Sequence, residues 1–284
     1  MMSANSAQRM RKIYGVVTML LSIGCGTSHR LPGKQYYQFI FSAKYFYNND
    51  TLHFALKNPL TCPLRISISS ADSSLNAIVT RFGTVTLKEK SDTVFDYYLK
   101  DHQKVVLNFN SVLGDVNRGI TEQKFSLPFP HNRVYKIIQG YYGWHSHNTD
   151  FSRYAIDFSL SIKDTVCAAA DGFVVGVINN YKYGGQTVDW LNYANYITIY
   201  YPSSGLFTQY VHLVKNGSFV KIGDTVRRGE PIGLSGETGY TTIPHLHFNV
   251  LRPDKKKGLV STEVDFEEGY KGKDLIENSM VKKN

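Results

Sequence analysis

Short runs of alternating apolar and polar residues recur along the first half of the chain, and turn-forming residues separate them. These runs are rich in β-branched and aromatic residues, which favour strands. We expect strands at residues 36–46, 52–56, 64–69, 77–87, 93–99, 104–109 and 123–127. About seven strands at this spacing predict an immunoglobulin-like β-sandwich over residues 35–129. No titratable cluster emerges from this half, so we interpret it as an adaptor or spacer.

The pattern changes after Leu127-Pro128-Phe129-Pro130, since two prolines in four residues favour an extended crossing between domains. Beyond it glycine is frequent, and the apolar runs predict strands at 154–160, 173–178, 196–201, 206–213, 219–222, 231–234 and 245–251. We therefore expect a second, mainly β domain over residues 130–254. A C-terminal extension over 255–284 begins with three lysines, and we expect it to contain a short helix near 275–280.

Residues 1–25 have the pattern of an export signal. Arg9, Arg11 and Lys12 form a basic region, and an apolar stretch too short to span a bilayer follows them. The stretch ends at Cys25 in Leu-Ser-Ile-Gly-Cys, which resembles the lipidation box of bacterial lipoproteins. We expect a lipid on Cys25, a tether at 26–34, and a membrane-anchored protein of the cell envelope that faces the periplasm or the cell exterior.

Length and composition are consistent with an exported protein of two domains. The chain has 284 residues, of which 19% are charged and 13% aromatic, a balance that argues against disorder. The formal charge is +9, and removing the three basic residues of the signal leaves +6, so an anionic envelope polymer is the expected partner. The sequence has no basic helix or zinc-finger spacing, and we expect no nucleic-acid binding. Cys62 and Cys167 are expected to be buried thiols, with a disulfide between them as the alternative.

Two histidines share one face of the last predicted strand. His245 and His247 flank Leu246, and residues two apart on a strand point the same way. A zinc site needs a third ligand and an open position for water. Upstream, His147 and Asp157 offer an imidazole and a carboxylate, and Asp157 lies in an otherwise apolar strand where an unpaired charge is costly. The pattern predicts a metal site.

Two rivals stand close to these candidates. His145 competes with His147, and Asp150 competes with Asp157. A further histidine, His212, follows the strand predicted at 206–213, where it can assist a metal-bound water if it meets His245. The chain has no His-Glu-x-x-His helix, so proton handling at a hydrolytic metal must fall to a histidine.

Several separated motifs occur in one characteristic order. They are His147, Tyr154-Ala-Ile-Asp157-Phe, Asp171-Gly172-Phe-Val, Tyr210-Val-His212-Leu, Gly223-Asp-Thr-Val-Arg-Arg-Gly-Glu-Pro-Ile-Gly233, Gly236-Glu-Thr-Gly239 and His245-Leu-His247-Phe. In this order they resemble the LytM/lysostaphin-type zinc metallopeptidases of family M23, from about residue 128 to residue 252. The sequence departs from the family pattern in two places: ten positions separate His147 from Asp157 where four are usual, and Ile243 stands where glycine often occurs.

The resemblance implies a small antiparallel sheet with a groove, one zinc ion, and hydrolysis of peptide bonds in peptidoglycan. It assigns His147, Asp157 and His247 as zinc ligands, and His212 and His245 as catalytic residues that assist the water. It also favours His147 over His145. Glycines at 184–185 and 236–239 are expected to let an extended peptide approach the groove walls. The alternative is a catalytically inactive relative that binds peptidoglycan or regulates a hydrolase. A lipoyl- or biotinyl-type carrier is a third interpretation, for which an evident modifiable lysine is missing.

Overall fold

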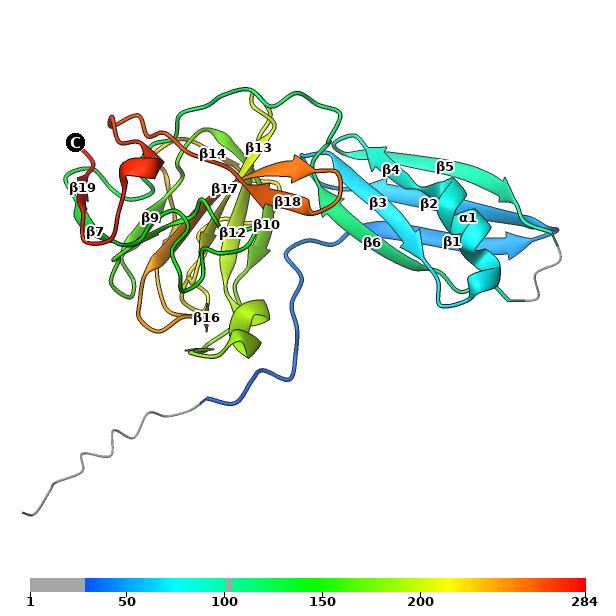
Figure 1. The fold of residues 1–284 in the computed structure, drawn as a ribbon. Helices are drawn as coiled ribbons and strands as arrows, with labels where there is room; N and C mark the ends of the chain where they lie inside the picture. Colours follow the sequence, from blue (N-terminus) through cyan, green and yellow to red (C-terminus); the bar gives the residue numbers. More distant parts are fainter. Residues whose placement is uncertain (1–28, 101–103) are drawn as a thin grey trace, which may run out of the picture.

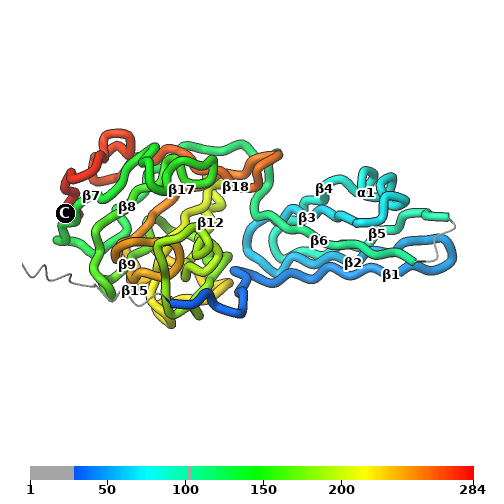
Figure 2. The backbone as a smooth tube through the Cα atoms, turned by 60° about the horizontal axis from the view of Figure 1, so that its bottom comes forward, coloured from blue at the N-terminus to red at the C-terminus, as the bar shows by residue number. Residues whose placement is uncertain are grey.

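The computed structural model describes residues 29–100 and 104–284, and the expected export signal and Cys25 lie outside this part. The described chain is mainly β and forms two lobes, as Figure 1 shows. We call residues 42–113 the N-terminal lobe, residues 134–282 the C-terminal lobe and residues 29–41 the arm. Figure 2 shows that the N-terminal lobe extends to one side of the C-terminal lobe.

The N-terminal lobe contains two three-stranded sheets with one core between them. One sheet has the order β1-β2-β5 and the other the order β4-β3-β6. The strands are β1 Ser42–Asn48, β2 Thr51–Asn58, β3 Leu64–Ser69, β4 Thr84–Leu87, β5 Ser91–Tyr98 and β6 Asn108–Leu113. Side chains of both sheets, such as Phe54 of β2 and Ile66 of β3, belong to the same buried cluster. The lobe is therefore stabilised by apolar contacts between the sheets.

The strand predicted at 77–87 is wrong in its first half. Residues Asn76–Phe82 form helix α1, after a short 3-10 helix η1 at Ser73–Leu75, and only Thr84–Leu87 is a strand. Ile78 and Phe82 are buried, and this spacing of four places them on one helical face. The run at 123–127 also forms no strand, because only Phe125 makes a bridge, to Phe266. The seven expected strands are thus six strands and a helix.

The C-terminal lobe is built on a nine-stranded sheet of order β14-β10-β12-β13-β17-β8-β7-β19, with β18 paired to β17. Its strands are β7 Val134–Gln139, β8 Ile156–Phe158, β10 Gly172–Ile178, β12 Tyr196–Tyr201, β13 Leu206–Val211, β14 Thr225–Val226, β17 Leu246–Asp254, β18 Gly258–Ser261 and β19 Met280–Lys282. Two small sheets pair β9 Thr165–Cys167 with β15 Pro231–Leu234, and β11 Gly184–Gly185 with β16 Gly239–Tyr240. The 3-10 helices are η2 Val188–Tyr193 and η3 Gly272–Asp274.

The end of the chain corrects a second prediction. The helix expected at 275–280 is absent: η3 is a single turn, and Met280–Lys282 forms β19, an edge strand paired with β7. Val281 is fully buried, so the tail packs into the core of the lobe. The strand expected at 219–222 is also absent, whereas β7, which the sequence pattern did not indicate, pairs with β8.

The two faces of the large sheet have different roles. Along β17, Leu246, Phe248 and Val250 point into the core of the C-terminal lobe. His247 and Leu251 alternate with them and point to the opposite face, which we call the outer face. Leu251 joins the core of the N-terminal lobe, while His247 remains open to the groove described below. The N-terminal lobe thus covers one end of the same face that carries the candidate site at its other end.

Arg65 links the two lobes. Its guanidinium is buried and donates hydrogen bonds to the carbonyl oxygens of Gly114 and Leu113 and, across the junction, to those of Asp254 and Gly258. Hydrogen bonds from a charged donor are stronger than neutral ones. The orientation of the lobes therefore depends on this side chain as well as on the shared apolar core.

Both described cysteines are buried free thiols, as expected. Burial raises the pKa of the Cys62 thiol, which keeps it protonated. Among residues 29–100 and 104–284, no helix has the length and hydrophobicity needed to cross a membrane.

Candidate metal centre

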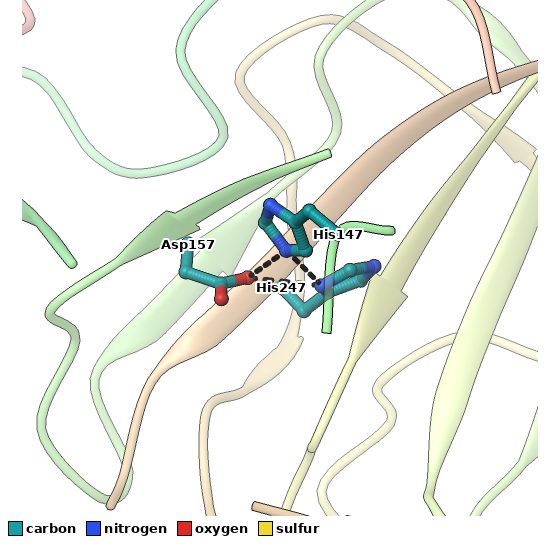
Figure 3. A group of neighbouring side chains, drawn as sticks. All are labelled: His147, Asp157 and His247. Atoms are coloured by element: carbon teal, nitrogen blue, oxygen red, sulfur yellow. Dashed lines mark hydrogen bonds and ion pairs between the residues drawn. The ribbon is translucent and has the colours of Figure 1, made fainter. Parts of the chain in front are cut away.

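Three side chains from two distant parts of the sequence meet on the outer face of the sheet. Asp157 lies on β8, directly opposite His247 on β17 and Gln139 on β7. Asp157 Oδ1 is 2.9 Å from His247 Nδ1 and 3.2 Å from His147 Nε2, and the two ring nitrogens are 3.2 Å apart. Figure 3 shows the three groups converging. His147 and Asp157 are buried, and His247 is partly exposed towards the groove.

The loop between β7 and β8 delivers His147. Over the ten positions between His147 and Asp157 the chain turns back on the strand, and internal hydrogen bonds hold the turn. His147 N donates to Gly143 O at 3.0 Å, and Ser152 Oγ donates to Ser146 O at 2.7 Å. The long spacing is accommodated by this folded loop, which brings the imidazole to the carboxylate.

The donor set fits a zinc ion. Tetrahedral zinc with bonds of about 2.0 to 2.1 Å requires donor atoms roughly 3.3 Å apart, close to the three separations found here. His147 Nδ1 donates to Gly140 O at 2.7 Å, so the proton is on Nδ1 and the lone pair of Nε2 points towards the other donors. Two neutral imidazoles and one carboxylate are ligands that zinc prefers.

The electrostatics of the cluster keep the carboxylate ionised. Burial raises the pKa of Asp157, but the nearby imidazoles of His147 and His245 and the polar contacts with His147 and His247 hold it well below its usual value. Burial lowers the pKa of His147, but the Asp157 carboxylate offsets this, and the pKa of His147 lies above its usual value. For His247 burial dominates, and its pKa is lowered. The carboxylate is thus available as a ligand at neutral pH.

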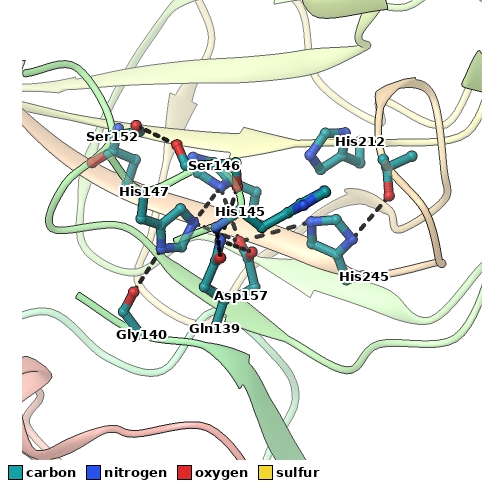
Figure 4. A network of polar contacts seen from close by, with 12 residues as sticks. Gln139, Gly140, His145, Ser146, His147, Ser152, Asp157, His212 and His245 are labelled. Carbon is teal, nitrogen blue, oxygen red and sulfur yellow. Dashed lines mark hydrogen bonds and ion pairs between the residues drawn. The ribbon is translucent and has the colours of Figure 1, made fainter. Parts of the chain in front are cut away.

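Two further histidines line the groove beside the three donors. His212 Nδ1 donates to Thr238 O at 2.7 Å, and His245 Nδ1 donates to Ile243 O at 2.9 Å, so the neutral tautomer of each ring has its proton on Nδ1 and its lone pair on Nε2. The ring centroids are 4.5 Å apart, and His245 Nε2 is 3.7 Å from Asp157 Oδ1. Figure 4 shows both rings beside the donor set.

His212 has an unusual backbone conformation. It directly follows β13 at a φ of 69°, a region that non-glycine residues seldom occupy. Burial and the neighbouring imidazoles of His245 and His247 lower the pKa of His212 well below its usual value, so it is neutral at pH 7. Backbone strain and a displaced pKa frequently occur together at functional sites.

Four of the five side chains, those of Asp157, His212, His245 and His247, line one groove of about 850 Å³, and His147 lies buried behind them. Trp144, Tyr240 and Ile243 line its walls, and the segment 273–277 next to η3 closes the side near β7. Gln38 of the arm lies on the opposite side, over β10 and β12. Because the sheet order is β10-β12-β13-β17-β8-β7, the groove crosses the strands with the metal-binding donors in its middle.

The glycines at 184–185 and 239 have a packing role in the wall of the groove. Gly184 and Gly239 belong to β11 and β16, which pair with one another. A Cβ on Gly184 would lie 2.2 Å from Glu237 O, and one on Gly185 would lie 2.2 Å from Nε1 of Trp190. These glycines let two loops pack closely and form a wall, and the close approach of a peptide to this wall stays a prediction.

The rival residues are distinguished by their positions. His145 lines the groove and stacks on Tyr240 with ring centroids 5.3 Å apart, outside the group of three donors. Asp150 is paired with Arg153 and Lys257 at the surface. Ile243, the departure from the family pattern, is partly exposed in the groove wall, and its carbonyl orients His245.

Sequence reasoning missed Gln139, which lies between the strand and the His147 loop. Its Nε2 donates to Asp157 Oδ2 at 3.3 Å and to Ser146 Oγ at 2.8 Å, and its Oε1 accepts from His145 N at 3.1 Å. The signal was a polar residue at the end of the run 134–138, which is apolar except for Lys136. The contributions of the arm and of segment 273–277 had no signal in the sequence.

The family of this domain follows from a comparison with known proteins. The model described as Peptidase family M23 matches residues 152–259. Residues 152–259 form an M23 domain. The match includes Asp157, His212, His245 and His247 and begins five residues after His147.

Individual relatives match the same part of the chain. The M23 domain is similar to the peptidoglycan DD-endopeptidase ShyA of Vibrio cholerae, with 39% identity over 95 residues, 34% of this chain and 19% of that protein. It is also similar to lysostaphin of Staphylococcus simulans, with 39% identity over 98 residues, 34% of this chain and 17% of that protein. The chain thus spans about a fifth of the length of these relatives. A solved structure of lysostaphin from Staphylococcus simulans aligns with 50% of this chain, and the alignment covers 51% of the lysostaphin chain. The sequence identity over this alignment is 28%, and the TM-score is 0.35.

Proposed function

We propose that this protein is a zinc-dependent endopeptidase that hydrolyses peptide bonds in peptidoglycan. The observation that carries the proposal is the group of three donors formed by His147, Asp157 and His247, which opens into a groove with two further imidazoles. The names of the relatives supply the substrate class, since ShyA is a peptidoglycan DD-endopeptidase. The basic character of the chain is favourable for an envelope polymer that carries negative charge.

Each residue has a role that follows from its geometry. His147, Asp157 and His247 would hold the ion, and Gln139 would keep the Asp157 carboxylate oriented. Bound zinc would supply Lewis acidity at this position. The groove crosses the strands, which suits an extended peptide whose scissile carbonyl lies over the donors.

His212 and His245 would handle the proton. Their Nδ1 atoms are held by backbone carbonyls, so each Nε2 can accept a proton from the attacking water and later donate it to the departing amine nitrogen. A protonated Nε2 also stabilises the oxyanion of the tetrahedral intermediate. The two rings are close enough to share these tasks, with one imidazole as base and the other as hydrogen-bond donor.

The proposal is tested by zinc content and by digestion of purified sacculi with residues 26–284. The parent protein is expected to bind one equivalent of zinc and to release soluble muropeptides, whose masses identify the bond that is cut. Asp157→Ala and His247→Ala should lose both properties, whereas Asp150→Ala, which removes an exposed carboxylate, should keep both. Zinc binding without digestion would favour the inactive, peptidoglycan-binding alternative. Absence of zinc, or full activity in Asp157→Ala, would refute the proposal.

We also propose that the protein is exported and anchored in a membrane by a lipid on Cys25. The support is the basic and apolar pattern of residues 1–24 before this cysteine, together with a substrate in the cell envelope. Expression of Cys25→Ala in a bacterial host should move the protein from the membrane fraction to the soluble fraction. Equal membrane association of the variant and the parent would contradict the anchor.

A further inference from the structure

A second cleft adjoins the metal-binding groove on the side of the arm. It has a volume of about 650 Å³ and lies between arm residues 35–41, β6 of the N-terminal lobe and the segment around η2. The cleft and the groove share three lining residues, Gln38, Leu191 and Tyr196. A ligand that lies across the sheet can therefore continue from the metal-binding donors into this cleft.

Hydrogen bonds fix the arm in this position. Gln38 O accepts from Val177 N at 2.9 Å, and Gln38 Oε1 accepts from Thr198 Oγ1 at 2.9 Å. Tyr36 N donates to the hydroxyl of Tyr181 at 2.8 Å. A Cβ on residue 176 would lie 2.4 Å from Gln38 Oε1, so Gly176 allows this close approach. Figure 1 shows the arm, in blue, running along the C-terminal lobe before it enters β1. The cleft is therefore a built feature of the two lobes together.

The chemistry of the cleft differs from that of the rest of the groove. None of its lining residues carries a charged side chain, and they combine aromatic rings and three aliphatic side chains with amides and hydroxyls. The rings belong to Tyr36, Tyr37, Phe39, Phe41, Phe109 and Tyr196, and the polar groups to Gln35, Gln38, Asn110, Asn192 and Ser111. At the opposite end of the groove the lining includes Lys273 and Glu277. The two ends thus favour different parts of a substrate.

Rings and amides together match an uncharged sugar. The C–H faces of a pyranose pack on aromatic rings, while its hydroxyl and acetamido groups exchange hydrogen bonds with side-chain amides, which offer both donors and acceptors. Tyr37 is 79% exposed at the rim of the cleft, where a ligand would cover it. No lining residue offers a counter-ion to a charged peptide, whose charges would lose hydration here with little compensation. The one cation found against the lining among the described residues is Lys34, whose ammonium lies 4.9 Å from the centroid of the Tyr36 ring.

We propose that this cleft binds the N-acetylated sugars of the glycan strand while the attached peptide lies over the metal-binding donors. The inference rests on the proposed function, because it treats the sugar and the peptide as parts of one substrate. The N-terminal lobe and the arm then contribute to substrate selection: β6 and the arm supply one wall of the sugar subsite, and the C-terminal lobe supplies the other.

The first experiment uses the full chain loaded with zinc and compares its activity on two substrates. One is a cross-linked stem peptide that carries its disaccharide, and the other is the same peptide without sugar. We expect kcat/KM to be roughly tenfold higher for the sugar-bearing substrate, because contacts remote from the reacting bond contribute to transition-state binding. Tyr37→Ala and Asn192→Ala should reduce this ratio towards one. Tyr98→Ala, which removes an exposed tyrosine of β5 outside the cleft, should leave the ratio unchanged.

The second experiment measures sugar binding without catalysis. The probes are the di- and tetrasaccharide of N-acetylglucosamine, titrated into the full-length Asp157→Ala protein by calorimetry and by NMR. We expect the tetrasaccharide to bind, and we expect Tyr37→Ala to weaken this binding at least roughly fivefold. A bare stem peptide that competes for the same cleft would overturn the proposal in favour of a peptide subsite, and failure of both sugars to bind would refute it.

The two proposals fail in distinguishable ways. If neither substrate is cleaved, the peptidase function is wrong, and the titration still tests the sugar subsite. If both substrates are cleaved with equal kcat/KM, the peptidase function stands and the sugar subsite is wrong.

Discussion

The candidate site depends on hydrogen bonds that hold each functional ring in one tautomer. His147, His212 and His245 all donate Nδ1–H to a backbone carbonyl, of Gly140, Thr238 and Ile243 respectively. The three rings come from different segments of the chain, yet each is left with its Nε2 lone pair free. Such partners fix ring orientation and basicity at metal sites and at catalytic bases.

At the same scale, Gln139 is expected to act as a positioning residue. In Gln139→Leu the Asp157 carboxylate loses one partner and the His147 loop loses two, so zinc affinity should fall about 10- to 100-fold. Competitive titration against a chromophoric chelator measures the change. The matched control is Gln186→Leu, which alters an exposed glutamine. Zinc affinity within twofold of the parent would show that the loop positions His147 without this amide.

His212 predicts a pH dependence for the metal-free protein. Its folded pKa lies well below its usual value, whereas in the unfolded chain a histidine binds a proton near pH 6.5. Unfolding therefore takes up a proton at low pH, so the stability that is present above about pH 6.5 is lost as the pH falls through that value. His147, whose pKa is raised, contributes in the opposite sense over the same range, so urea unfolding at pH 7.5 and 5.5 measures the His212 contribution as a difference between the parent and a variant.

The variant that tests this pH dependence is His212→Asn, because asparagine tolerates the positive φ of this position. It should lose less stability between pH 7.5 and 5.5 than the parent does, while His247, whose pKa is also lowered, retains part of the effect. In the control variant, His131→Asn, the loss of stability between pH 7.5 and 5.5 should equal that of the parent. An equal loss in His212→Asn and in the parent would contradict the assignment.

At the scale of elements, the groove depends on two loops that meet as a small parallel sheet. β11 and β16 pair through Gly184 and Gly239, and the residue after Gly239, Tyr240, lines the groove. The short strands stabilise a wall that would otherwise consist of two independent loops. Backbone atoms occupy the space beside Gly184, so a larger residue must displace the partner loop.

Gly184→Ala is therefore expected to destabilise the protein by about 1 to 3 kcal/mol, because its Cβ would overlap the carbonyl oxygen of Glu237. Chemical denaturation followed by circular dichroism measures the free energy of unfolding. Gly119→Ala is the control, since nothing lies within 4 Å of a Cβ at that position. Equal stability of the two variants would show that the loops adjust without cost.

At the scale of the whole molecule, one face of the large sheet is shared between a lobe and a site. His247 and Leu251 are four residues apart on β17 and point the same way, one towards the metal-binding donors and the other into the core of the N-terminal lobe. The position of the N-terminal lobe therefore determines how far the groove extends. Arg65 secures this position through carbonyl acceptors on both sides of the junction.

Arg65→Met should weaken the junction. The substitution keeps much of the apolar stem but leaves four carbonyl acceptors, two of them buried and two partly buried, without their donor, which is expected to reduce the free energy of unfolding by about 3 kcal/mol. We also expect faster proteolysis of the connection 114–133. Arg81→Met, at an exposed position on α1, is the control. Unchanged stability and proteolysis in Arg65→Met would mean that the apolar contacts alone hold the lobes.

The strands with strong period-two patterns could be predicted from the sequence alone. β3 has the predicted bounds because apolar and polar residues alternate along it, and β12 has them because its β-branched and aromatic run ends at Pro202. The error at 77–87 has a physical reason: Ile78 and Phe82 satisfy a helical spacing as well as an apolar run, and packing against β3 decides between the two. Short strands such as β7 and β19 form because a partner strand is available, which no local pattern records.

The candidate site likewise has features that the sequence determines and features that depend on the tertiary structure. The sequence by itself determined the kinds of donor and the shared face of His245 and His247, because strand geometry is local. Only the tertiary structure decided between His147 and His145 as neighbours of Asp157, since that choice depends on how the loop folds over β7. The arm, segment 273–277 and Gln139 reach the groove through long-range contacts, and such contacts follow from the packing of the whole chain.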